Sequence, residues 1–312
     1  MLRVLFFLAS TLVLGSIYGQ GIHLKTQSDG SAVRLRWAID EPADWQWAND
    51  HGYTISRMTR KVNGQTLTLG QQAQSRVVLT NTFKPLALGA WGSDELNQSA
   101  RNILDASQWQ ATATDPFAAA AETTTNAENR LFFAHVLAER DYDLAVGLAL
   151  GYSDATAQTD KEYVYTVTIN QRSVNNQAHS TGSVGPLNAG AMGGLGRGAD
   201  QLAPVTDLLV QSGDTTVRVG WSTERTKYLY TSYDIYRAPT GSTTFTKAND
   251  IPFMPGFTGE GEDPEFAMFS DSVATYGEYD YYVVGRTPFG LFGPPSDTVA
   301  ASSRPVRLAL IM

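Results

Sequence analysis

The chain contains one series of segments twice, in the same order. The matched pairs are 33–37 (VRLRW) with 217–221 (VRVGW), 53–57 (YTISR) with 233–237 (YDIYR), and 153–167 with 270–284. Within each segment the large apolar residues occupy every second position, as Val33, Leu35 and Trp37 do. A period of two is typical of a strand with one buried face. The sequence therefore predicts two copies of one β-domain.

The two copies differ mainly in the length of one connection. From Arg57 to Asp154 the chain runs for 154−57 = 97 residues. The matching stretch, from Arg237 to Asp271, runs for only 271−237 = 34 residues, so the first copy carries about 97−34 = 63 more. Closing a longer surface loop costs little extra entropy, so β-domains tolerate such insertions. We place the insertion at about 81–150.

Three features of the repeat resemble the fibronectin type III domains of large secreted bacterial proteins. A tryptophan closes the second strand of each copy (Trp37, Trp221), the third strand reads Tyr-x-Ile-x-Arg, and the sixth reads Tyr-x-Tyr-x-Val. The resemblance implies a mostly β fold of two immunoglobulin-like β-sandwiches in tandem, the first with an α-helical insertion of about 60 residues. It also implies that Tyr163 and Tyr279 form tyrosine corners, whose hydroxyls bond to upstream backbone. Segment 289–299 then fits the last strand of the second copy.

The long connection after Arg57 begins with a hairpin signal and continues, over the insertion, with helical patterns. Asn63 and Gly64 suit a type I′ turn, because both residues tolerate positive φ. The expected strands around and after this turn are 60–62, 65–69 and 76–80, and the expected helices are 94–106 (N-capped by Ser93), 127–139 and 142–149. Residues 111–126, rich in Ala and Thr, are expected to form a loose excursion. We interpret the helices as a cover for the sandwich, a role compatible with a partner surface.

The N-terminus has the pattern of an export signal. Arg3 is followed by an apolar run over 4–14 and by small residues, and this run is shorter than the ~20 residues that a spanning helix needs. We therefore expect a cleaved signal peptide at 1–19 and a mature chain that is secreted, extracellular or periplasmic, with no transmembrane segment after cleavage. The remaining boundaries are expected to be domain 1 at 20–178, a Gly-rich linker at 179–203, domain 2 at 204–306, and a tail at 307–312.

Charge and cysteine content exclude several classes of function. The net charge of −8 and pI of about 5.0 leave little basic surface for nucleic acid. The chain has no cysteine, which excludes disulfides and thiolate metal sites. The sequence contains no nucleophile elbow, no zinc-binding helix motif and no phosphate-binding loop motif. We therefore expect neither catalytic activity nor a cofactor.

Candidate binding residues are few. The acidic loop residues Glu260, Glu262, Asp263 and Glu265 are a weak Ca²⁺ candidate without the alternating spacing of an established loop, so no metal site is predicted. Trp45, Trp47 and Trp91 either stack on sugar rings or pack the insertion onto the sandwich. The four histidines are scattered singly, and His135, on an apolar helical face, is expected to be a packing residue.

Three functional hypotheses remain. The first is a secreted, non-catalytic scaffold or binding module, whose partner is a protein or a cell-surface glycan. The second is a carbohydrate-binding accessory protein that uses exposed aromatic residues. The third is a glycan-active enzyme in which Asp141 and Asp143 converge with Glu122, at the ~5–9 Å separation that glycoside hydrolysis requires. The sequence predicts neither the specific partner nor the oligomeric state.

Overall fold

The computed structural model describes residues 21–172, 177–179, 184, 192–193, 202–255, 265–273 and 276–304. Two compact units make up the chain, Met1–Gln201 and Leu202–Met312, and each is described by itself. The expected signal peptide at 1–19, the tail at 307–312 and most of the linker at 179–203 lie outside the described residues. No helix in the described ranges is long and apolar enough to cross a bilayer.

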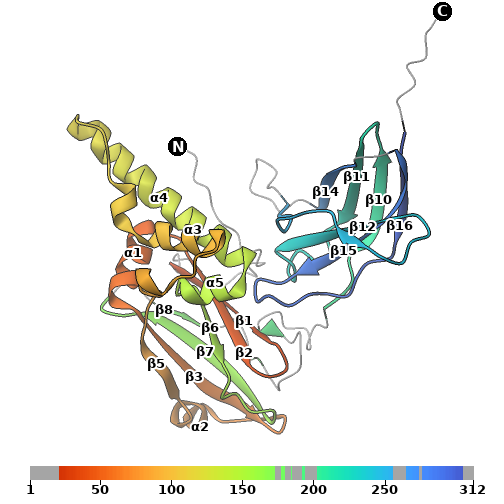
Figure 1. Cartoon of the computed structure of the whole chain (residues 1–312). Coiled ribbons are helices and arrows are strands. Elements are labelled where there is room, and N and C mark those ends of the chain that lie inside the picture. The colour runs from red at the N-terminus through yellow and green to blue at the C-terminus, as the bar shows by residue number, and fades with distance from the viewer. Residues whose placement is uncertain are drawn as a thin grey trace, which may run out of the picture. The chain divides into compact units, whose positions relative to one another are not determined.

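The first unit contains two antiparallel sheets (Figure 1). One has the strand order β6-β2-β1-β9, and the other has the order β4-β3-β7-β8 with β5 also paired to β3. The strands are β1 (Ile22–Ser28), β2 (Val33–Ile39), β3 (Tyr53–Val62), β4 (Gln65–Thr66), β5 (Val77–Phe83), β6 (Gly151–Asp154), β7 (Lys161–Ile169), β8 (Gln177–His179) and β9 (Met192–Gly193). Asn63 and Gly64 have φ of 49° and 77°, which confirms the predicted hairpin turn between β3 and β4.

The second unit repeats this plan. Its sheets have the orders β10-β11-β14 and β13-β12-β15-β16, so β10, β11 and β14 correspond to β1, β2 and β6 of the first unit. The strands are β10 (Thr206–Ser212), β11 (Thr216–Ser222), β12 (Ser232–Pro239), β13 (Thr246–Lys247), β14 (Phe266–Ser272), β15 (Gly277–Arg286) and β16 (Val299–Ser303). The last strand is therefore β16, and the prediction of a strand over 289–299 was wrong. Backbone over 289–298 adopts turns and irregular structure instead.

An aromatic cluster joins the two sheets in each unit. Trp37 on β2 lies with its ring centroid 5.3 Å from Tyr53 on β3 and 6.1 Å from Phe83 on β5. Its counterparts in the second unit are Trp221, Tyr233 and Phe253, with ring separations of 5.0 Å and 5.6 Å from Trp221. Both tryptophans are fully buried. Each cluster takes rings from both sheets of its unit, so it connects the two sheets through aromatic packing.

All of the described helices belong to the first unit. They are α1 (Pro42–His51), α2 (Leu69–Gln74), η1 (Leu88–Ala90), α3 (Glu95–Leu104), η2 (Ala106–Trp109), α4 (Pro116–Arg140) and α5 (Tyr142–Gly147). The N-cap of α3 is Asp94, not Ser93, because its carboxylate accepts the Asn97 N–H. Helices α1 and α2 were not predicted: α1 fills the connection between β2 and β3, and α2 begins where the strand over 65–69 was expected to end.

Helix α4 is much longer than predicted. Asp115 accepts the Ala118 N–H and Pro116 occupies the first turn, an arrangement that starts a helix well. The helix consequently begins at Pro116, and the expectation of a loose excursion over 111–126 was wrong for its second part. Only the C-terminal part of α4 is buried, through Arg130, Leu131, Ala134, His135, Leu137 and Ala138.

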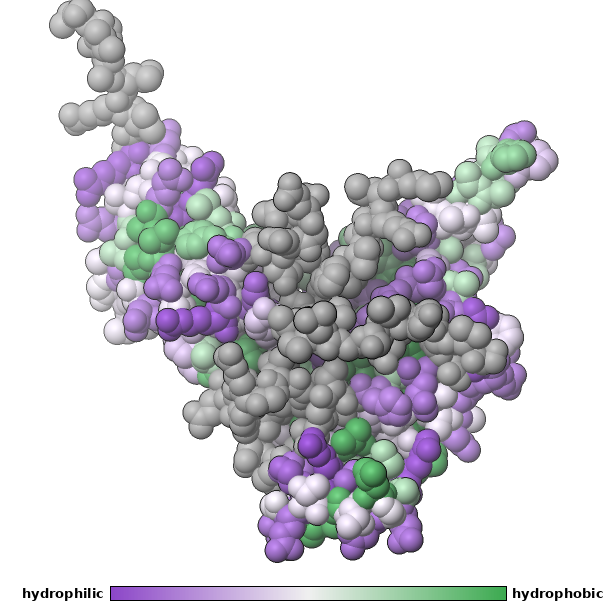
Figure 2. All heavy atoms as spheres, turned by 180° about the vertical axis from the view of Figure 1, so that it is seen from behind, coloured by the Kyte–Doolittle hydropathy of each residue, from purple (hydrophilic) through white to green (hydrophobic). Residues whose placement is uncertain are grey.

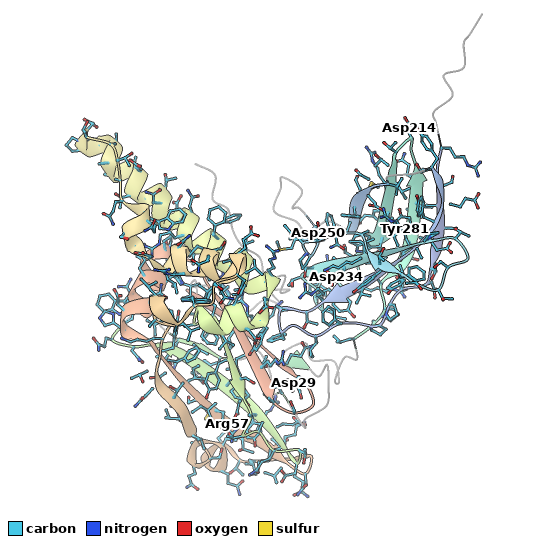
Figure 3. All side chains as sticks on the ribbon, viewed as in Figure 1. Asp29, Arg57, Asp214, Asp234, Asp250 and Tyr281 are labelled. Atoms are coloured by element: carbon cyan, nitrogen blue, oxygen red, sulfur yellow. The ribbon has the colours of Figure 1, made fainter. Side chains whose placement is uncertain are left out.

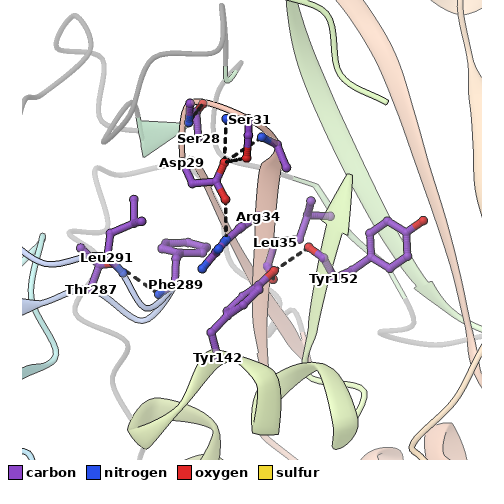
Figure 4. Close-up of polar contacts among 12 residues, drawn as sticks. Ser28, Asp29, Ser31, Arg34, Leu35, Tyr142, Tyr152, Thr287, Phe289 and Leu291 are labelled. Carbon is purple, nitrogen blue, oxygen red and sulfur yellow. Dashed lines mark hydrogen bonds and ion pairs between the residues drawn. The ribbon is translucent and has the colours of Figure 1, made fainter. Parts of the chain in front are cut away.

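Two polar contacts fix the helices to the strands. The guanidinium of Arg36 on β2, fully buried, donates to Glu139 on α4 at 3.2 Å and to the carbonyls of Trp37 and Leu150 at 2.7 Å and 3.0 Å. The hydroxyl of Tyr142, at the start of α5, donates to the Tyr152 carbonyl at 2.7 Å (Figure 4). The C-terminal part of α4 and helix α5 are therefore part of the core of this unit.

His135 should make the first unit sensitive to acid. Burial, followed by the nearby Arg36 charge, lowers the pKa of His135 from 6.5 to about 4, against smaller opposing effects of Ile39 and Asp40. As the pH falls, His135 therefore binds a proton in the unfolded chain before it does so in the folded chain. The free energy of unfolding is at its full value above pH 6.5 and decreases as the pH falls toward 4. The loss should reach about 3 kcal/mol. Urea unfolding at several pH values would measure this loss. If the free energy of unfolding of the His135→Gln variant fell with pH as steeply as that of the unchanged protein, His135 would not be the group responsible.

Candidate functional site

Each unit contains the same buried group of arginine, aspartate and tyrosine. In the first unit Asp154 accepts from Arg57 and, at 2.7 Å, from the Tyr165 hydroxyl. In the second unit Asp271 accepts from Arg237 at 2.7 Å and from the Tyr281 hydroxyl at 2.7 Å; Arg57 and Tyr281 are labelled in Figure 3. The repeated segments of the sequence contain all of these residues.

The electrostatics of these groups indicate a structural role. Burial, together with the neighbouring carboxylate, raises the pKa of both Tyr165 and Tyr281, so both hydroxyls stay protonated and donate. Each aspartate is at most 4% exposed. A carboxylate that is paired, hydrogen-bonded and withdrawn from solvent joins strands rather than meeting a substrate. We call each group a clasp and assign neither to a binding site.

The predicted corner tyrosines lie beside the clasps. The Tyr163 hydroxyl accepts the Gln158 N–H at 3.1 Å, five residues upstream, and the Arg57 guanidinium lies 4.5 Å from its ring centroid. Tyr279 is 9% exposed, and the Arg237 guanidinium lies 5.6 Å from its ring centroid. The contribution of these hydroxyls to stability stays a prediction.

The three candidate binding tryptophans do not form one platform. Trp45 on α1 is fully buried, with the Arg130 guanidinium 5.4 Å from its ring, so it cannot stack on a sugar from solvent. Trp47 stacks on His51 at 4.0 Å, has Arg172 5.4 Å from its ring, and donates to the Asn170 carbonyl. These two rings therefore pack the chain's own side chains.

Trp91 fills the space above a glycine. A Cβ built on Gly147 of α5 would lie only 2.6 Å from the Trp91 ring, so the two residues are in close contact. The ring is half-buried. Trp91 thereby packs the segment before α3 against α5, so its contact joins two parts of the predicted insertion rather than the insertion and the sheets.

The candidate carboxylates do not converge. Asp141 and Asp143 lie at the start of α5, where Asp141 caps the Asp143 and Leu144 N–H groups. Glu122 lies on α4, 141−122 = 19 residues before Asp141, the residue that caps the end of this helix. At 1.5 Å per residue this separation is about 28 Å. No site of the glycosidase type forms from them.

The acidic loop of the second unit is described only in part. Glu260, Glu262 and Asp263 lie outside the described residues, and Glu265 is exposed. Within the described ranges, no three His, Asp or Glu side chains are grouped to hold a metal ion.

The feature of the first unit best placed to meet a partner is a projecting arm. We define the arm as residues 105–129, which comprise η2, the following connection and the N-terminal half of α4. No residue of α4 before Arg130 is buried, and this half of the helix extends beyond the other helices of the unit (Figure 1).

Hydrogen bonds hold the two sides of the arm together. The Glu122 carboxylate accepts the N–H groups of Thr112 and Ala113 at 2.9 Å and 3.0 Å, and these bonds lower the pKa of Glu122. Asn126 donates to the Trp109 carbonyl at 3.0 Å. Because the returning chain is bonded to the helix at two levels, the arm has a defined conformation.

The base of the arm is anchored in the core. Arg130 donates to the carbonyls of Ile103 and Leu104 at 2.8 Å and 3.0 Å, which caps the C-terminal end of α3. Sequence reasoning missed the arm, although Asp115-Pro116 is a helix-start signal that would have placed it.

The surface of the arm is acidic and carries one exposed aromatic ring, with a second beside its base. Its charged residues are Asp105, Asp115, Glu122 and Glu128, and it contains no Lys, Arg or His. Phe117, in the first turn of α4, is 91% exposed, and Phe133, at the base, is 43% exposed. Apolar residues gather at the projecting end in the space-filling view (Figure 2). A large exposed ring on a defined helix is typical of an anchor for a pocket on another molecule.

Comparisons with known proteins assign no family. No family model matches the chain, and no curated protein matches it. Among solved structures, the chain is similar to a segment of two fibronectin type III domains from chicken tenascin, with 8% identity and a TM-score of 0.25, over 91% of this chain and 97% of that one. It is also similar to module A71 of titin from human cardiac muscle, with 20% identity and a TM-score of 0.25, over 33% and 90%.

A third similarity is to a family 76 glycoside hydrolase from a bovine Bacteroides thetaiotaomicron strain, with 14% identity and a TM-score of 0.24. The match covers 33% of this chain and 20% of that one, so this chain spans about a fifth of the hydrolase. Similarities at these TM-scores carry no conclusion about fold family or activity.

Proposed function

We propose that this protein is a secreted, non-catalytic binding module that recognises another protein through the arm. In this proposal the two units are tandem fibronectin type III-like sandwiches, and the helices of the first are an insertion into that plan. The shared strand order and the paired aromatic clusters and clasps support the duplication. The export signal pattern at 1–19 supports secretion.

The observation that carries the proposal is the exposure of Phe117 on a defined helix. Burying one exposed phenylalanine side chain contributes about 2 kcal/mol or more to binding when it fills a pocket. The arm's four carboxylates, without a neighbouring cation on the arm, favour a partner whose pocket is bordered by Lys or Arg. Binding should accordingly weaken as the salt concentration rises.

Deleting the end of the arm should abolish binding without unfolding the protein. Because Asn126 donates to the Trp109 carbonyl, a Gly-Gly-Ser linker can replace 110–125, and Asn126 can then cap the shortened helix. Affinity capture from the extracellular material of the native cells, quantified by mass spectrometry, should recover a partner with the full chain and not with this variant.

Point variants test the anchor itself. Phe117→Ala should weaken the captured interaction by about 30-fold, whereas Leu69→Ala, which removes a comparably exposed apolar side chain from α2, should leave it unchanged. Circular dichroism checks that both variants are folded. Equal capture by the arm deletion and the full chain would refute the arm as the recognition element.

A further inference from the structure

One sheet of the second unit has an apolar row on its outer face. In the sheet β10-β11-β14, Leu209, Gly220 and Met268 are paired across the three strands (Figure 1). Trp221, the neighbour of Gly220, belongs to the aromatic cluster shared with the other sheet, so this row faces away from that sheet. Leu209 is 57% exposed and Met268 is 49% exposed. An antiparallel sheet with one face in solvent ordinarily has polar residues there.

The ring of Phe266 extends this row into a patch. Phe266 lies two residues before Met268 on β14, hence on the same face, and is 37% exposed. A Cβ built on Gly220 would lie 2.5 Å from the Cε1 atom of Phe266, so the ring lies directly over β11. We define the apolar patch as Leu209, Phe266 and Met268. Adjoining exposed apolar side chains of this kind indicate a surface that another molecule covers.

The first unit shows how the corresponding face is covered. Because Trp37 corresponds to Trp221, the corresponding row consists of Lys25, Arg36 and Gly151. Helices lie on this row. Glu139 of α4 pairs with Arg36 at 3.2 Å. A Cβ built on Gly151 would lie 3.3 Å from the Cβ of Ala145 on α5.

The second unit lacks those helices. The connection that contains α4 and α5 spans 97 residues in the first copy, and the matching connection spans 34. The described residues of the second unit include no helix. The same sheet face therefore occurs twice, once under helices and once with exposed apolar side chains. Since the two faces share one strand order, a helix is the kind of element that the second face accommodates.

The row beside the patch adds one positive charge. Arg218 lies two residues before Gly220 on β11, so its side chain is on the same face, and it is exposed. Its guanidinium donates to the neutral Gln211 side chain at 3.4 Å. The three strands span about 10 Å, and two turns of helix are about 11 Å long. A short helix with an acidic residue beside its apolar stripe therefore fits this face.

We propose that the apolar patch binds an amphipathic helix of another protein. The apolar stripe of that helix contacts Leu209, Phe266 and Met268, and an acidic residue at one end of the stripe meets Arg218. This surface lies in the second unit, is separate from the arm, and does not depend on the function proposed above.

Three helical peptides built from alanine and glutamine test the proposal with the full chain. The first has leucines spaced i, i+4, i+7 and i+11, with a glutamate one turn before the first leucine. The second has a lysine in place of the glutamate, and the third has the leucines of the first distributed around the helix. Fluorescence polarisation at low salt should show about threefold tighter binding of the first than of the second, and no binding of the third.

Variants of the protein locate the binding site. Met268→Glu should weaken binding of the first peptide more than tenfold, whereas Ser272→Glu, on the same strand and face, should leave it unchanged. Arg218→Glu should reverse the preference between the first two peptides, and Arg101→Glu, which makes the same charge change in the first unit, should not. Circular dichroism checks that each variant is folded.

A fluorescent label gives an independent readout. The chain has no cysteine, so Met268→Cys or Ser272→Cys provides a single labelling position. A polarity-sensitive dye at 268 should shift to shorter wavelength when the first peptide binds, because the helix excludes water there. The same dye at 272 should not shift.

Several results would overturn the proposal. They are the absence of binding by the first peptide, equal binding of the first and third peptides, and binding that Met268→Glu leaves unchanged. Peptide binding that appears only after deletion of residues 305–312 would make this chain's own tail the occupant. Sedimentation equilibrium that showed a dimer abolished by Met268→Glu would instead make a second copy the occupant.

Discussion

Glu139→Ala should lower the free energy of unfolding of the first unit by about 3–5 kcal/mol. The variant removes the carboxylate that faces Arg36, whose guanidinium is fully buried and cannot be solvated in its place. Burial already lowers the pKa of Arg36, yet the group stays charged at neutral pH because its ordinary pKa is so high. The variant therefore keeps a buried cation without its counter-charge.

Urea unfolding, with hydrogen exchange followed separately in the two units, would measure this loss. Glu139→Gln should cost less, because an amide oxygen still accepts from Arg36. The double variant Arg36→Met/Glu139→Leu should recover much of the loss, since an apolar pair of similar volume needs no charge compensation. A change below about 1 kcal/mol in Glu139→Ala would show that the C-terminal part of α4 covers the sheets without stabilising them.

Asp271→Ala should destabilise the second unit by about 3 kcal/mol. Two hydrogen bonds end on this carboxylate, from Arg237 and from Tyr281, and both donors would be left in a mostly buried position. The loss should be confined to the second unit, since the corresponding Asp154 clasp belongs to the first.

A matched set of variants separates charge from hydrogen bonding at this clasp. Tyr281→Phe removes one bond and should cost about 1–2 kcal/mol, and Asp271→Asn should fall between the two. Hydrogen exchange should show faster opening of β14 and β15 with unchanged exchange in the first unit. If Asp271→Ala melted as the unchanged protein does, the clasp would have no stabilising role.

The alternation of residues along the chain was sufficient to place the strands of the repeated segments, but not strands such as β1 and β8, which lie outside those segments. Val33, Leu35 and Trp37 recur as Val217, Val219 and Trp221, and all six are buried on the corresponding strands β2 and β11. Local turn chemistry was equally reliable at Asn63-Gly64, because positive φ there is a property of the two residues themselves. Such features depend on neighbours in the sequence and can be predicted without a tertiary structure.

Helix ends were predicted less well. The Asp115-Pro116 start signal for α4 is local, but the Ala- and Thr-rich stretch after it has no apolar stripe to indicate a helix. That half of α4 needs no stripe because it is not packed against a core. Hydrophobic periodicity arises where one face of a helix is buried. A helix that projects into solvent therefore cannot be predicted from it.

The sequence by itself determined that the chain contains one order of strands twice, with a longer connection in the first copy. Strand periodicity and repeat spacing are properties of neighbouring residues and can be read without the fold. Only the tertiary structure decided which polar groups act together. Asp154 meets Arg57 across 97 residues, and Arg36 meets Glu139 across 103. The same holds for exposure: Trp45 is fully buried whereas Phe117 is 91% exposed. Pairing and burial depend on which distant segments pack together, and that is set by the fold as a whole.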